Sequence, residues 1–155
     1  MPVFKNLGRG SGRIGTIVPS TNRNLEPDFF LLAPPGVSLH FVRVSSGELS
    51  AIPDSVQMQK YARSEIELPT QLLVDARVDV IAYGCTSATL SSSPEFDETL
   101  SRNIESLGGI PTVTAAGALL EAVGALGVSK AAFVLSLIHI SEPTRRTPIA
   151  YAVFC

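Results

Sequence analysis

The sequence predicts an α/β fold in which a four-stranded parallel sheet is wound with helices on both faces. Short apolar runs alternate with longer amphipathic stretches along residues 13–126, which is the pattern of strands connected by helices. No internal repeat or low-complexity linker interrupts this alternation. Strands joined through helices pair in parallel by right-handed crossovers, so the loops that follow the strands should share one ligand-facing edge.

The four expected strands are short runs of mainly apolar residues, rich in valine and isoleucine, at residues 13–18, 37–44, 78–83 and 110–113. The helical stretches between and after them are expected at residues 25–32, 55–75, 94–107 and 115–126. Asp54 and Ser93 stand where N-caps would, and Gly108 and Gly127 where C-caps would. Pro69, inside the second helical stretch, predicts a kink or a break.

Composition narrows the class of protein. The chain has 155 residues, 45% of them hydrophobic and 17% charged, which suits one globular domain with its own core. A net charge of −2 without a basic stripe argues against a nucleic-acid or membrane-surface partner. Without a recognisable leader or an apolar run of spanning length, we expect a cytoplasmic protein that acts on a small molecule.

The residues that could form a disulfide framework or bind a metal ion are few. The chain has two cysteines, Cys85 and Cys155, and two histidines, His40 and His139. None of these residues is spaced like a metal-ligand cluster. We therefore expect neither a disulfide framework nor a metal site.

The glycine-rich stretch 10–15 matches the dinucleotide fingerprint G-x-G-x-x-G only as text. That fingerprint must follow a strand and open a helix, whereas these glycines precede the first expected strand or lie in it. We interpret the stretch as an entry segment with no part in ligand binding.

Two loops at expected strand ends carry polar groups. Residues 19–24 (PSTNRN) follow the first strand and residues 84–89 (GCTSAT) follow the third. Hydroxyls, an amide and backbone N–H groups near a helix start can bind carboxylate oxygens. The same donors would favour the thiolate form of Cys85. The alternative stays open at this point, since these residue types are common in turns and cysteine is often buried.

Three stretches in this order resemble the aspartate/glutamate racemase superfamily, and most of all its maleate cis-trans isomerases and arylmalonate decarboxylases. They are RIGTIVPSTNRNLEPDF, VDVIAYGCTSAT and GGIPTVTAAGALLEAVGALGVSKAAFV, which together span residues 13–134. The resemblance implies a protein of two similar α/β halves that close around a small dicarboxylate. It also implies that no metal or organic cofactor is used and that the full-length protein is a homo-oligomer.

The resemblance also implies roles for residues in the two loops. Cys85 is similar to the catalytic thiol of the first half, and Asn22 to the amide that binds a substrate carboxylate. Thr86 and Ser87 are similar to the oxyanion and carboxylate donors, and Pro19 and Ser20 would shape the pocket.

In the isomerases that this sequence resembles, the thiolate adds to the double bond of maleate, the resulting single bond rotates, and elimination gives fumarate. The racemases instead use one cysteine on each face of the α-carbon to remove and return a proton. The decarboxylases have glycine at the position of Cys85, so this residue argues against decarboxylation. Ala88, where the isomerases tend to have glycine, leaves the substrate's shape open.

The last part of the chain departs from this resemblance. Residues 128–134 are similar to the start of a second half, whereas LSLIHISEPTR, which begins at Leu135, resembles the translation of a sequencing-library adapter. We interpret residues 1–134 as an N-terminal domain that includes the first residues of the second half, and residues 135–155 as a non-native tail. The rest of the second half would then be missing, and residues 141–155 should form no regular packed element. The alternative is a natural C-terminal extension, because the apolar residues 135–140 could continue a strand.

The function that this interpretation predicts is cofactor-independent isomerisation of maleate through Cys85, in a chain that is inactive by itself. An amino-acid or hydantoin racemase and an arylmalonate decarboxylase are alternatives within the superfamily. Two alternatives belong to other classes. One is a non-catalytic α/β ligand-binding protein and the other is a nonfunctional truncated product.

Overall fold

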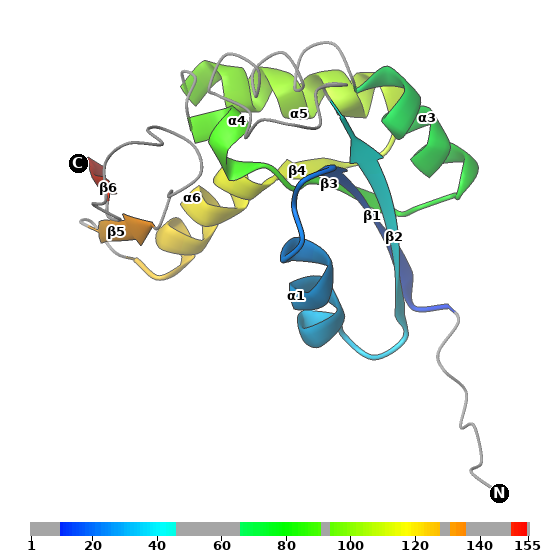
Figure 1. Cartoon of the computed structure of the whole chain (residues 1–155), viewed down its shortest axis with the longest axis horizontal. Coiled ribbons are helices and arrows are strands. Elements are labelled where there is room, and N and C mark those ends of the chain that lie inside the picture. The colour runs from blue at the N-terminus through cyan, green and yellow to red at the C-terminus, as the bar shows by residue number, and fades with distance from the viewer. Residues whose placement is uncertain (1–9, 46–65, 91–93, 128–130, 136–149, 155) are drawn as a thin grey trace, which may run out of the picture.

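Four parallel strands form one sheet in the order β2-β1-β3-β4 (Figure 1). The computed structural model describes residues 10–45, 66–90, 94–127, 131–135 and 150–154. The strands are β1 (Gly12–Pro19), β2 (Val37–Val44), β3 (Val80–Tyr83) and β4 (Thr112–Thr114). The predicted fold class, a four-stranded parallel sheet with helices, is therefore confirmed.

Helices lie on both faces of this sheet. They are α1 (Leu25–Leu32), α3 (Glu67–Asp75), α4 (Thr86–Leu90), α5 (Pro94–Gly108) and α6 (Ala115–Ala125). A Cβ on Gly15 of β1 would contact Leu73 of α3 at 3.0 Å, whereas a Cβ on Gly84, just after β3, would meet Leu25 of α1. Successive strand residues face opposite sides, so α3 and α1 cover opposite faces of the sheet (Figure 1).

The core lies mainly between the sheet and the pair α3 and α5, which contact each other. Its largest fully buried side chains belong to both layers and include Ile17, Leu73, Ile81, Tyr83, Leu100 and Ile104. Burial of such side chains stabilises each by about 1.5–3 kcal/mol relative to exposure. This packing fixes the central strands β1 and β3 and therefore the loops that follow them.

Two strands begin later than the sequence predicts. Asp79 uses its carboxylate to accept a hydrogen bond from the Arg13 backbone N–H at 2.7 Å, and β3 starts only at Val80. Pro111 has no N–H to give to a ladder, and β4 starts directly after it. β2 and α1 have the predicted bounds.

The helix ends bear on three positions named from the sequence, Pro69, Gly108 and Gly127. Pro69 lies in the first turn of α3, where no intrahelical N–H bond is needed, and the helix begins at Glu67, which fits the predicted break and not a kink. Gly109, with a φ of 64°, and not Gly108, takes the left-handed conformation after α5. Gly127 has the predicted left-handed conformation after α6. Residues 55–65 of the second helical stretch, with Asp54 and Ser93, lie outside the described residues.

The expectation of no regular element in residues 141–155 is wrong at residues 150–154. There β6 (Ala150–Phe154) pairs antiparallel with β5 (Ala131–Leu135), with Phe133 opposite Ala152. The five residues of β6 are apolar, three of them aromatic or β-branched, and such residues suit a pleated strand. The origin assigned to residues 135–155 stays a prediction.

Candidate functional site

The two polar loops lie next to each other at the carboxyl edge of the sheet. β1 and β3 are adjacent parallel strands in which Ile17 is opposite Tyr83. The Gly84 N–H donates to the Ile17 carbonyl at 2.8 Å, so the chain before Cys85 is hydrogen-bonded to the end of β1. The structure thus brings Asn22 and Cys85 to one edge of the sheet, while their roles in binding or catalysis stay predictions.

Gly84 is the point where the two loops pack together. A Cβ at this position would lie 2.2 Å from Leu25 Cδ2 and 3.5 Å from the Ile17 carbonyl oxygen. Real carbon atoms do not approach each other so closely, so a side chain here would force the Leu25 side chain to move. The glycine before Cys85 therefore allows Leu25 to pack closely against the end of β3.

Replacing Gly84 with alanine should lower the free energy of unfolding by about 1–3 kcal/mol, because overpacking displaces Leu25. Urea unfolding followed by circular dichroism measures this change. Gly124→Ala is the matched control, since nothing lies within 4 Å of a Cβ there. Gly124 is the second-last residue of α6, so its replacement by alanine should leave the stability unchanged or raise it by up to about 0.5–1 kcal/mol. Equal stabilities of the two variants would contradict the packing described at Gly84.

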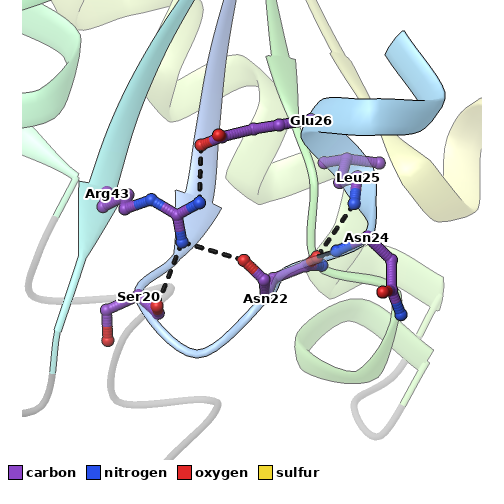
Figure 2. Close-up of polar contacts among 6 residues, drawn as sticks. All are labelled: Ser20, Asn22, Asn24, Leu25, Glu26 and Arg43. Atoms are coloured by element: carbon purple, nitrogen blue, oxygen red, sulfur yellow. Dashed lines mark hydrogen bonds and ion pairs between the residues drawn. The ribbon is translucent and has the colours of Figure 1, made fainter. Parts of the chain in front are cut away.

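Asn22 is held by its backbone and by its side chain (Figure 2). Its N–H donates to the Pro19 carbonyl at 2.9 Å, which closes a tight turn after β1. Its side-chain Oδ1 accepts the backbone N–H groups of Asn24 and Leu25, both at 3.0 Å. Since both partners are donors, the atom that faces them must be the oxygen, and Nδ2 is left as the group that can donate to a ligand.

Cys85 lies between β3 and the five-residue helix α4. The residue is 5% exposed and belongs to the hydrophobic core cluster. The Thr89 hydroxyl donates to the carbonyls of Cys85 at 3.4 Å and Thr86 at 3.1 Å, which ties the turn to α4. No helix was predicted at residues 86–90, because serine and threonine also favour turns.

The remaining predicted residues surround these two. Pro19 is buried at the end of β1, and Ser20 is half-buried and donates its N–H to the Val44 carbonyl at 2.7 Å. Thr86 is half-buried at the first position of α4, and Ser87 follows it in the same helix.

Tyr83 has a hydroxyl that is buried and has no hydrogen-bond partner among the described residues. Its burial raises the pKa of this phenol well above its ordinary value, and the neighbouring Cys85 raises it further. Tyr83 therefore stays neutral at physiological pH and cannot act as a general base.

A polar cluster that the sequence analysis missed lies at the end of the next strand. Thr114, the last residue of β4, donates to Asp97 Oδ2 at 2.8 Å and accepts the Gly117 N–H at 2.9 Å. Asp97 Oδ1 is buried and has no partner within the described part of the chain. The signal for Thr114 was its position before the alanine-rich stretch of α6, which is typical of an N-cap.

Among the described residues, no group of three histidine, cysteine, aspartate or glutamate side chains is arranged to hold a metal ion. Likewise, within those ranges, no helix has the length and apolar character that a bilayer crossing requires. His139 and the last residue, Cys155, lie outside the ranges that the structure describes.

Comparison with known proteins points to maleate isomerases. No family model matches the chain. A maleate isomerase from Geobacillus stearothermophilus is 27% identical over 134 residues, which covers 79% of this chain and 52% of the relative. The chain therefore spans about half the length of this curated relative.

Solved structures agree with this similarity. A maleate isomerase from Pseudomonas putida S16 with maleate has a TM-score of 0.62 and 26% identity, covering 75% of this chain and 49% of that one. The Nocardia farcinica maleate cis-trans isomerase bound to TRIS gives 0.56 and 25%, with coverages of 75% and 49%. An arylmalonate decarboxylase shares the fold, with a TM-score of 0.52 at 23% identity and coverages of 74% and 48%. The chain is thus homologous to maleate isomerase over most of its length, and it has the fold found in both maleate isomerase and arylmalonate decarboxylase.

Proposed function

We propose that residues 1–134 form the N-terminal α/β domain of a cofactor-independent cis-trans isomerase that converts maleate to fumarate. Homology to maleate isomerase supports an isomerase of the racemase superfamily. The observation that carries the finer proposal is the contact between the two loops, because it brings an amide donor and a thiol to one sheet edge. Residues 135–155 would take no part in this function.

Binding would depend on donors from both loops. The Asn22 Nδ2, which faces no backbone donor, is suited to one carboxylate of the substrate. The hydroxyls of Ser20, Thr86 and Ser87 would serve the remaining oxygens, and buried Pro19 would shape the floor beside them. Hydrogen bonds to a charged carboxylate contribute more than neutral ones, about 1.5–3 kcal/mol each.

Catalysis would begin at Cys85. Its thiolate adds to one carbon of the double bond, and the electron pair moves to the other carbon and its carboxylate. The carbon–carbon bond, now single, rotates. The electron pair then re-forms the double bond in the trans geometry and expels the thiolate, so no net proton or electron is consumed.

The burial of Cys85 favours a second candidate, a non-catalytic α/β domain that binds a small dicarboxylate at the same edge. In that case Cys85 would be a packing residue of the core cluster. The two candidates differ in what the thiol does and not in where the ligand lies. Racemase and decarboxylase activities of the same superfamily would use this edge too.

Titrating the ¹⁵N-labelled chain with maleate tests the shared element of these candidates. The amide signals of residues 20–25 and 84–89 should shift together and saturate, because donors in both loops contact one ligand. Succinate and chloride at the same ionic strength serve as controls for geometry and for charge. Shifts at the amino ends of the strands, for example near Arg13, or no saturable shifts at all, would contradict the proposed site.

A further inference from the structure

Arg43 connects the end of β2 to the loop that carries Asn22 (Figure 2). Its Nη1 donates to the backbone carbonyls of Ser20 at 3.0 Å and Asn22 at 2.8 Å. Its Nη2 donates to Glu26 Oε1 at 2.6 Å, an ion pair with the first turn of α1. One guanidinium group thus contacts three acceptors from two parts of the chain.

Arg43 and the start of α1 both hold Asn22. The carbonyls of Ser20 and Asn22 flank Thr21, and both turn toward Nη1 of Arg43. On the other side, Asn22 Oδ1 accepts the N–H groups that begin α1. The backbone of Asn22 is therefore fixed by Arg43 and its side chain by α1, and together these contacts set the direction of Nδ2.

We propose that Arg43 is a positioning residue that orients the Asn22 amide and does not itself bind the substrate. The proposal rests on the proposed function only where it gives the oriented amide a substrate carboxylate to bind. The orientation of the amide is a property of the chain alone. Both hydrogens of Nη1 and one of Nη2 are used within the protein. A carboxylate that took Nη1 as its partner would have to displace two carbonyls of the turn, which leaves only the Nε hydrogen and the second Nη2 hydrogen for other acceptors.

Arginine is required here by geometry. Its planar fork presents several donors in fixed directions, whereas a lysine ammonium is a compact charge on a flexible stem. The side chains of Arg43 and Glu26 are 40% and 30% exposed, so solvent screens their ion pair. Arg43 should therefore mainly affect how well ordered the loop at residues 19–24 is, and not the global stability of the chain.

Hydrogen exchange on the 155-residue chain tests the proposal without any ligand. In Arg43→Met the Leu25 and Asn24 amides should exchange roughly tenfold faster, since their acceptor Asn22 Oδ1 loses its fixed position. The two Asn22 side-chain amide signals should move together toward random-coil shifts. Core amides such as Ile81 should keep their exchange rates. Arg43→Lys should accelerate exchange to an intermediate degree, and it carries the test if Arg43→Met does not fold.

Two other arginines give matched controls. Arg13→Met removes a side chain at the opposite end of the neighbouring strand that bonds the Arg77 carbonyl at 3.4 Å. Arg102→Met removes a surface ion pair with Glu98 on α5. Neither should change exchange at Leu25 or the Asn22 side-chain signals. Unchanged Leu25 exchange and Asn22 signals in Arg43→Met, or equal changes in Arg13→Met, would overturn the proposal.

A maleate titration separates this proposal from the proposed function. If the unsubstituted chain binds maleate, Arg43→Met should weaken binding about tenfold, whereas direct contact with the substrate would make Arg43→Met as damaging as Asn22→Ala or more so. If the unsubstituted chain binds no maleate, the proposed function fails at this step. The exchange comparison would still decide whether Arg43 orients Asn22.

Discussion

The 155-residue chain should show no measurable conversion of maleate to fumarate, whereas a version in which residues 1–134 continue into a complete second half should convert it. The relatives that the chain matches are about twice as long as the part it covers. A substrate on the carboxyl edge of this sheet would meet donors from the described loops on one side only. Water on the other side would solvate the developing charge and weaken every contact inside the site.

Proton NMR measures this difference directly, because the vinyl protons of maleate and fumarate give separate signals. Both proteins are first compared by thermal unfolding, so that an unfolded short chain is not mistaken for an inactive one. Supplying the second half as a separate chain should restore part of the activity if the halves associate. Turnover by the 155-residue chain near the rate of the completed version would show that this edge is sufficient by itself.

The sequence predicted the sheet because its elements depend on local patterns. β2 and α1 have the predicted bounds, since an apolar run flanked by turn residues determines each of them. The residues at which β3 and β4 begin were less predictable. Asp79 pairs with the Arg13 backbone across 66 positions of sequence, and no local pattern reveals such a contact.

In the candidate site, too, some features followed from local sequence patterns and others did not. The proximity of the two loops followed from parallel pairing, because the carboxyl ends of adjacent strands meet at one edge. Arg43 did not follow, since its partners lie 17 to 23 positions away and an arginine in a strand usually reads as a solvent-exposed residue. Its position second from the end of β2, beside the Asn22 loop, was the signal that could have found it.

In the completed version, Cys85→Ser should lower the rate of maleate isomerisation by about a thousandfold or more. A serine hydroxyl stays protonated at neutral pH and is a far weaker nucleophile than a thiolate. The substitution is nearly isosteric at a position that is 5% exposed, so the fold should survive it. The affinity for maleate should change by less than about threefold, because Asn22 and its neighbouring donors would provide the binding.

Thr89→Ser is the matched control for disturbance of this turn. It keeps the hydroxyl that donates to the Cys85 carbonyl and removes one buried methyl group. Stability should fall by about 1 kcal/mol, while activity should stay within a few-fold of the unsubstituted protein. A loss of activity in Thr89→Ser as large as that in Cys85→Ser would assign the effect to the shape of the turn.

The role of Cys85 as a nucleophile is tested by the initial rate of fumarate formation by the completed version, with and without Cys85→Ser, at a maleate concentration that saturates both proteins. We predict that the fumarate signal grows with Cys85 and stays at the uncatalysed rate with serine, while both proteins show the same maleate-induced shifts in the two loops. Equal rates for the two proteins would show that Cys85 is a packing residue and would leave the chain without the proposed nucleophile.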